Sequence, residues 1–184
     1  MSFSKFILKT AGWKVNITVP NFDKCLICVA PHTSNWDFII GKLAYRSVGR
    51  DAGFLMKSTW FFPPMGWIFR AIGGIPVYRN KKPGAPSLTQ QIVRKFKTMS
   101  RLQLAITPEG TRRRVGTWHT GFLHIAWDAS VPVCLGVIDF ATRTVTIDTV
   151  FTPTGNTEAD MEAIKSYYRA VAPTGRNPQN FTAD

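Results

Sequence analysis

The sequence is poor in acidic residues and in cysteine. Only 11 of its 184 residues are Asp or Glu, against 23 Lys and Arg, so the formal net charge is +12 with neutral His. This imbalance favours an anionic partner such as nucleic acid, an acidic membrane or a phosphorylated substrate. The three cysteines cannot all pair and are too few for a disulfide scaffold, which favours a reducing compartment.

Long apolar runs are also missing. No stretch reaches the roughly 18–20 apolar residues that a membrane-spanning helix needs, and the longest candidate, 60–69, is interrupted by Pro63, Pro64 and Gly66. The segment 1–14 lacks the apolar centre and the cleavage site of a signal peptide. We therefore expect a protein that lies on a membrane without crossing it. Its aromatic content of 12% suits a surface at the lipid headgroup layer.

Apolar patterning alternates between strands and helices along the chain. It predicts strands at 13–19, 25–30, 53–57, 75–78, 102–107, 132–139 and 142–150, and helices at 3–11, 37–48, 87–99, 120–129 and 157–171. Ser87 with Gln90 forms a capping-box pattern at the start of the helix 87–99. This order predicts a single α/β domain over 1–184, with a mixed, mostly parallel sheet flanked by helices. The last two strands should form an antiparallel pair near the C-terminal end. Residues 1–12 are expected to form an interfacial helix, and the tail 173–184 is expected to be loose.

His32 is the histidine best placed for chemistry. It follows the buried strand 25–30, at the strand end where open α/β sheets bind ligands. Asp37 comes five residues later, in the first turn of the next helix, where its carboxylate can fold back onto one imidazole nitrogen. Such a pair fixes the histidine tautomer and stabilises the imidazolium. The alternative is a helix-start carboxylate beside an unrelated loop histidine.

Two further strand ends carry polar residues. The loop after strand 102–107 contains Glu109, Gly110, Thr111 and Arg112, in which glycine permits close backbone approach and arginine offers a forked donor. The strand 75–78 is followed by Arg79. Because parallel strands end at one edge of a sheet, the three polar ends are expected to converge.

These segments together resemble a known family. The run His32-Thr33-Ser34-Asn35-Trp36-Asp37 is similar to the H-x4-D motif of the glycerolipid acyltransferases, which include the lysophosphatidic acid acyltransferases. The segments 74–79, 108–112 (Pro-Glu-Gly-Thr-Arg) and 131–133 resemble the second, third and fourth blocks of that family, in the same order.

The resemblance implies transfer of an acyl group to the hydroxyl of a lysophospholipid such as 1-acylglycerol-3-phosphate. The co-substrate would be acyl-CoA or an acylated carrier protein, with no other cofactor and no metal. It implies His32 as general base and Asp37 as its orienter. Around the acceptor's head it implies the substrate-binding residues Arg79, Glu109, Gly110, Thr111 and Arg112. The expected location is cytoplasmic and peripheral, on an anionic inner membrane face, with no nucleic acid as partner.

The chain departs from the family pattern at two positions. Leu135 stands where a second proline is common, and His119 stands where a lysine is common, which makes His119 a candidate substrate-binding residue. The acceptor therefore stays open between a phosphate-headed lysolipid and a lyso-aminolipid. A basic nucleic-acid-binding domain and a non-catalytic lipid-binding relative are the competing functions, although no nucleic-acid recognition motif is found.

Two other patterns allow alternatives. The spacing of Cys25, Cys28 and His32 is compatible with a zinc site. In one extended strand, however, residues 25 and 28 point to opposite faces. Buried core cysteines are the better interpretation.

The aromatic stretch 60–69 is either core or a membrane-facing surface, and Pro63, Pro64 and Gly66 disfavour a regular buried helix.

Overall fold

The computed structural model describes residues 2–78 and 84–183. The helices are α1 (Phe3–Thr10), α2 (Asn35–Ser47), α3 (Met65–Ala71), α4 (Leu88–Thr98), α5 (Gly121–Ala129) and α6 (Thr157–Val171), with short 3-10 turns η1 (Ser58–Trp60) and η2 (Pro178–Asn180). The strands are β1 (Lys14–Ile17), β2 (Lys24–Ala30), β3 (Gly53–Lys57), β4 (Gly74–Val77), β5 (Leu102–Ile106), β6 (Val133–Asp139) and β7 (Thr144–Phe151).

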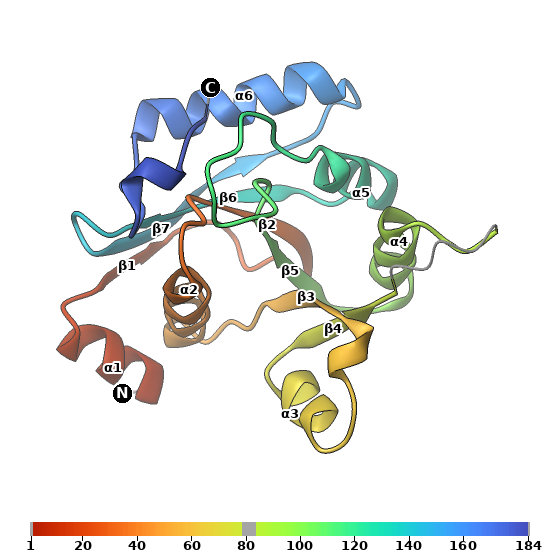
Figure 1. Ribbon diagram of the computed structural model, residues 1–184, viewed down its shortest axis with the longest axis horizontal. Helices are drawn as coiled ribbons and strands as arrows, with labels where there is room; N and C mark the ends of the chain where they lie inside the picture. Colours follow the sequence, from red (N-terminus) through yellow and green to blue (C-terminus); the bar gives the residue numbers. More distant parts are fainter. Residues whose placement is uncertain (1, 79–83, 184) are drawn as a thin grey trace.

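The strands form one sheet in the order β1-β7-β6-β2-β5-β3-β4 (Figure 1). Neighbouring strands pair in parallel, except for the antiparallel pair β6–β7. The predicted α/β class, with its mostly parallel sheet and antiparallel pair near the C-terminal end, is confirmed.

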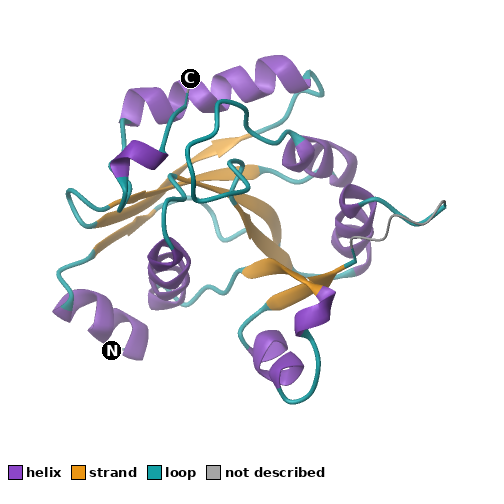
Figure 2. Cartoon of the chain, in the orientation of Figure 1, coloured by secondary structure: helices purple, strands orange, loops and turns teal. Residues whose placement is uncertain are grey.

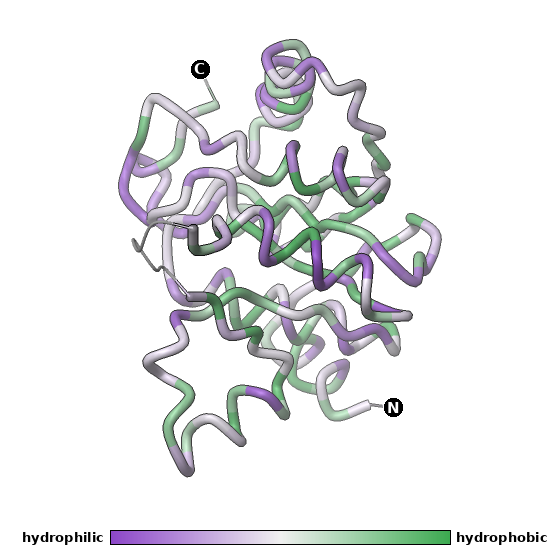
Figure 3. The backbone as a smooth tube through the Cα atoms, turned by 90° about the vertical axis from the view of Figure 1, so that its right-hand side faces the viewer, coloured by the Kyte–Doolittle hydropathy of each residue, from purple (hydrophilic) through white to green (hydrophobic). Residues whose placement is uncertain are grey.

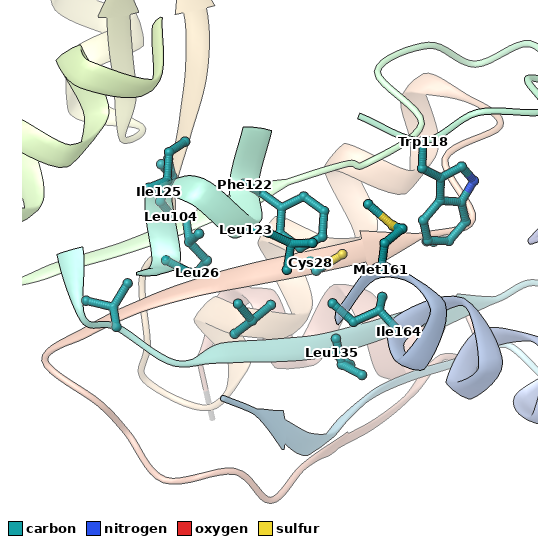
Figure 4. Packing of buried hydrophobic residues seen from close by; sticks show 14 of the residues in the cluster. Leu26, Cys28, Leu104, Trp118, Phe122, Leu123, Ile125, Leu135, Met161 and Ile164 are labelled. Atoms are coloured by element: carbon teal, nitrogen blue, oxygen red, sulfur yellow. The ribbon is translucent and has the colours of Figure 1, made fainter. Parts of the chain in front are cut away.

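Helices cover both faces of the sheet (Figure 2). Helices α4, α5 and α6 lie on one side, and α1, α2 and α3 lie on the other. Strand β2 alternates accordingly: Leu26 and Cys28 belong to the core cluster that includes α4–α6, whereas Cys25 and Ile27 belong to a cluster that includes Tyr45 of α2. Figure 4 shows side chains of β2, β5 and β6 packed against α5 and α6. The central strands are accordingly hydrophobic in sequence (Figure 3).

The crossovers create a crevice between the carboxyl ends of β2 and β5. Helix α2 carries the chain from β2 to β3 on one side, and α5 carries it from β5 to β6 on the other. In open α/β sheets, connections that diverge in this way leave room for a ligand at the strand ends. The loops 31–34 and 107–112 border this crevice.

Local sequence signals explain the helix starts. Ser87 caps α4 by accepting from the backbone N–H of Gln90 at 3.1 Å, and the Gln90 side chain accepts from the Ser87 N–H at 2.9 Å. Such a reciprocal pair satisfies two N–H groups that the helix itself leaves free. The capping box predicted from sequence is therefore present.

The C-terminal tail is packed, which corrects the prediction that 173–184 is loose. The backbone N–H of Phe140 donates to the carbonyl of Thr174 at 2.8 Å, and Trp118 Nε1 donates to the carbonyl of Thr182 at 3.1 Å. Ala183 is buried. The Pro- and Gly-containing composition was misleading because contacts with distant segments order this tail.

The aromatic stretch 60–69 is mostly surface. Trp60, Phe62 and Trp67 are each more than half exposed, whereas the rings of Phe61 and Phe69 face each other with centroids 5.9 Å apart. The interpretation of this stretch as core is thus wrong for Trp60, Phe62 and Trp67. They lie in and beside η1 and α3, near the β4 edge of the sheet (Figure 1).

Candidate active site

The loop after β2 brings His32 and Asp37 together, as their spacing predicts. Nδ1 of His32 lies 3.3 Å from Oδ2 of Asp37. The carboxylate side chain is 2% exposed and the imidazole 21%. Because Nδ1 faces the carboxylate, Nε2 is the nitrogen left to meet a substrate.

Helix capping explains the position of Asp37. Ser34 is the N-cap of α2, and Asp37 Oδ2 accepts from the backbone N–H groups of Thr33 at 2.6 Å and Ser34 at 2.8 Å. A carboxylate in the first turn also meets the positive end of the helix dipole. The same carboxylate therefore caps the helix and faces the imidazole, and the role of Asp37 as orienter of a base stays a prediction.

Glu109 is a buried part of the scaffold. Its two carboxylate oxygens each lie 3.1 Å from the backbone nitrogen of His32, and the residue is 2% exposed. Burial raises the pKa of Glu109 to about 7, and the negative charge of Asp37 adds to the rise, while the N–H of His32 opposes it. The expected contact with the acceptor's head does not fit this burial. Glu109 instead ties the loop 107–112 to the loop of His32.

Arg112 joins the same two loops from the surface. Its guanidinium donates to the side-chain oxygen of Asn35, the first residue of α2. The guanidinium is exposed and lies at the wall of a cavity, as do Gly110 and Thr111. These three residues occupy positions consistent with the substrate-binding prediction.

His119 lies over Gly110. Gly110 has φ +66°, and a Cβ added there would lie 2.5 Å from Cδ2 of His119. The backbone N–H of His119 donates to the carbonyl of Pro108 at 2.8 Å. The glycine of this loop is therefore required both by its left-handed backbone and by the close imidazole.

Arg79 lies outside the described residues. Strand β4, which precedes it, ends at Val77 and is separated from β2 by β5 and β3. Its predicted role in substrate binding stays a prediction.

A cavity of about 970 Å³ begins at these loops and extends between α2 and the sheet. His32, Asp37, Thr111 and Arg112 give it a polar end. Elsewhere its walls are largely apolar, with side chains from α2, β3, β6 and β7: Phe38, Ile39, Phe54, Leu55, Met56, Val137, Ile138, Val145 and Ile147. A concave site with a polar end and apolar walls suits an amphiphilic ligand.

Sequence reasoning missed three features of this site. It assigned no contact to Asn35, it did not reveal the cavity, and it did not place the tail beside the loop that carries His32. Asn177 contacts Thr33 across 144 positions of sequence. No local pattern signals such a contact.

The described residues show neither a metal cluster nor a membrane span. Within 2–78 and 84–183, no three His, Cys, Asp or Glu side chains are arranged to hold a metal ion. Across the same residues, no helix combines the length and the apolar character needed to cross a bilayer.

Comparison with known proteins identifies the family. The model of the family described as Acyltransferase matches residues 15–138, which is more than half of the chain. The chain belongs to the acyltransferase family. The match includes the His32 loop and the loop 107–112, and it ends before the tail.

Individual acyltransferases resemble this chain at 20–29% sequence identity. The 1-acyl-sn-glycerol-3-phosphate acyltransferases of Salmonella typhimurium and Salmonella typhi are each 29% identical over 110 residues, covering 58% of this chain and 44% of theirs. The crystal structure of the 1-acyl-sn-glycerophosphate (LPA) acyltransferase PlsC from Thermotoga maritima has a TM-score of 0.57 and 20% identity, covering 92% of this chain and 77% of that one. This structural likeness supports the fold. The chain spans less than half the length of the Salmonella relatives.

Burial of Glu109 predicts a pH-dependent stability. Its pKa rises from 4.5 to about 7 on folding, so between these values the unfolded chain releases a proton that the folded chain keeps. The contribution of Glu109 to stability therefore falls as pH rises from about 4.5 and is lowest above about 7. We therefore expect the free energy of unfolding of Glu109→Gln to rise, relative to that of wild type, by on the order of 2–3 kcal/mol as the pH increases across this window.

Urea unfolding of both proteins at a series of pH values measures this difference. A further difference between the two unfolding free energies, equal at every pH, is expected because the amide has one acceptor oxygen instead of two. Parallel stability curves for the two proteins would contradict the assignment of a buried, proton-retaining carboxyl.

Proposed function

We propose that this protein transfers an acyl group from a thioester to the hydroxyl of a lysophospholipid. One observation carries the proposal: His32, supported by a buried Asp37, lies at the polar end of a large apolar cavity. Membership of the acyltransferase family supports the reaction class. The polar end suits the reacting groups, and the apolar walls suit a fatty acyl chain.

The proposed reaction uses His32 as general base. Nε2 takes the proton of the acceptor hydroxyl as its oxygen attacks the thioester carbonyl carbon. The tetrahedral adduct then breaks its carbon–sulfur bond, and the imidazolium returns the proton to the departing thiolate. Asp37 stabilises the imidazolium between the two steps. A well-placed base contributes about 10²–10⁴ in rate.

The exposed guanidinium of Arg112 is proposed to bind the acceptor's phosphate. A guanidinium presents a planar fork that matches two phosphate oxygens. Asn35 holds Arg112 beside the start of α2, so a phosphate bound there would lie at the same end of the cavity as His32. A lysophospholipid acceptor such as 1-acylglycerol-3-phosphate follows, with acyl-CoA or an acylated carrier protein as donor.

Replacement of the His–Asp pair tests the proposed chemistry. His32→Ala should lower acyl transfer by at least ~10² because the base is removed, and it should leave thermal unfolding nearly unchanged because the imidazole is partly exposed. Asp37→Asn should lower the rate by up to ~10⁴, the loss known for the serine-protease counterpart, and should also weaken the cap of α2.

Transfer from a radiolabelled thioester, normalised to folded protein, gives the rates. His124→Ala is the matched control, since His124 is exposed on α5, away from the crevice. Retention of more than about a tenth of the activity in His32→Ala would remove the general-base role.

The cavity beneath α2 is proposed to hold the acyl chain. Gly41 and Ile138 both line it, and a Cβ added to Gly41 would lie 3.4 Å from Cδ1 of Ile138. Larger side chains at position 41 should therefore shorten the cavity. Each excluded methylene costs ~0.8 kcal/mol, or about fourfold in specificity.

The series Gly41→Ala and Gly41→Leu should progressively shift donor preference toward shorter acyl chains. Competition among donors of several lengths, resolved by product mass, measures the shift. Gly116→Leu is the control because a side chain there enters open space. An unchanged chain-length preference in Gly41→Leu would place the acyl chain elsewhere.

Peripheral attachment to an anionic membrane is the remaining part of the proposal. Phe3 and Phe6 of α1 and Trp60, Phe62 and Trp67 near α3 are each more than half exposed. Both groups lie on the α2 side of the sheet (Figures 1 and 2). Arg143 and Arg176 add positive charge to a groove of about 530 Å³ that α1 and α2 border.

Flotation with vesicles tests the attachment. Binding should require anionic lipid and weaken with added salt, because each basic residue near the surface contributes ~1 kcal/mol that salt screens. Joint replacement of Phe3, Phe6 and Trp60 by Ala should weaken it further. Trp127→Ala, on the opposite side of the sheet, should not. Equal binding to neutral and anionic vesicles at low salt would remove the electrostatic part of the proposal.

A further inference from the structure

The tail after α6 directly contacts the catalytic loop, residues 31–34, which carries His32. The backbone N–H of Asn177 donates to Oγ1 of Thr33 at 3.2 Å, and Nδ2 of Asn177 donates to the carbonyl oxygen of Thr33 at 2.9 Å. Thr33 is 2% exposed. The two bonds hold both the side chain and the backbone of a residue that lies next to His32 in sequence.

The Asn177 side chain makes this contact instead of a local one. Asn177 precedes η2, a position from which asparagine commonly caps the following turn, yet it makes no side-chain cap there. Its amide group is directed at Thr33, across 144 positions of sequence. The side chain therefore hydrogen-bonds to the catalytic loop and not to its own turn.

Thr33 connects this contact to the reacting groups. Its backbone N–H donates to Oδ2 of Asp37 at 2.6 Å, and the same oxygen faces Nδ1 of His32 at 3.3 Å. A displacement of Thr33 would therefore displace the carboxylate relative to the imidazole. Three successive contacts lead from the tail to the base.

Gly175 fits closely against the same loop. A Cβ added there would lie 2.8 Å from both Cγ2 and Oγ1 of Thr33 and 3.3 Å from Cγ of Pro31. Only a residue without a side chain permits this approach. The loop and the tail are thus complementary in shape as well as in hydrogen bonding.

The tail is anchored independently at both ends of this contact. Before it, the N–H of Thr174 donates to Oδ1 of Asp139 at 3.2 Å. After it, Nη1 of Arg169 donates to the carbonyl of Ala183 at 2.8 Å, and Trp118 Nε1 donates to that of Thr182. Trp118 precedes His119, whose N–H bonds to Pro108 at the start of the second site loop. The tail therefore connects both site loops to the rigid sheet and to α6.

We propose that Asn177 and Gly175 are positioning residues that hold the His32–Asp37 loop in its reactive geometry. This inference rests on the proposed acyl transfer for its kinetic consequence, although its geometric part stands on the contacts alone. The residues lie beyond 138, where the family match ends. A misplacement of about 1 Å in a reacting group can cost roughly 10² in rate.

The test compares Asn177→Ala with Asn180→Ala, a matched asparagine three positions later that makes no side-chain hydrogen bond to any described residue. Asn177→Ala should lower kcat by roughly 10- to 100-fold with little change in either KM, because positioning and not binding is lost. Asn180→Ala should behave as wild type. Gly175→Ala removes no hydrogen bond, yet it should reproduce the kcat loss by pushing Thr33 away.

Amide hydrogen exchange separates positioning from general destabilisation. The amides of Thr33 and Ser34, which donate to Asp37, should exchange faster in Asn177→Ala, whereas those of β2 should be unchanged. Unchanged exchange at Thr33 and a kcat within twofold of wild type would overturn the inference, and so would equally faster exchange throughout β2. If the wild-type protein transfers no acyl group, the proposed function fails, and the exchange comparison alone then decides the positioning role.

Discussion

The buried carboxylate of Asp37 is the interaction on which the site depends. Its oxygens accept from the backbone of Thr33 and Ser34 and from the Ser34 hydroxyl, and one of them faces Nδ1 of His32. Burying a charged group is unfavourable unless hydrogen bonds replace its lost hydration, and here the start of α2 supplies those bonds. The stability of the helix start and the orientation of the imidazole are therefore one arrangement.

A second carboxylate links this arrangement to the neighbouring strand. Glu109 accepts the backbone N–H of His32 on the buried side, and Arg112 donates to Asn35 at the surface. The loop after β5 therefore contacts the loop after β2 and the start of α2 at two places. The sheet topology makes this pairing feasible because β2 and β5 are adjacent and their crossovers diverge. The two loops thus behave as one unit bordering the cavity.

Local signals carried most of what the sequence predicted. The capping box at Ser87, the antiparallel strands near the C-terminal end and the contact of His32 with Asp37 all depend on residues close together in sequence, where periodicity and capping are informative. The family resemblance located the loop 108–112 but did not reveal the burial of Glu109, which depends on how two loops meet. Residue types alone do not reveal such packing.

Long-range contacts account for the remaining differences. The tail, predicted to be loose from its composition, is ordered by Thr33, Trp118 and Asp139, and these contacts span distant parts of the chain. The cavity depends on how α2 and the strands β3, β6 and β7 come together around it, which no pattern within α2 encodes. The exposure of Trp60 and Trp67 depends in the same way on where α3 lies at the sheet edge.

The mass of the lipid product shows whether this protein transfers an acyl group to a lysophospholipid. Folded wild-type protein is offered phosphate-headed and amino-headed lysolipids, each with acyl-CoA and with acylated carrier protein. Acyl transfer to a phosphate-headed lysolipid should give a product equal in mass to that lysolipid plus one acyl chain, from at least one donor. Absence of any acylated lipid across all combinations, or release of free fatty acid alone, would contradict it.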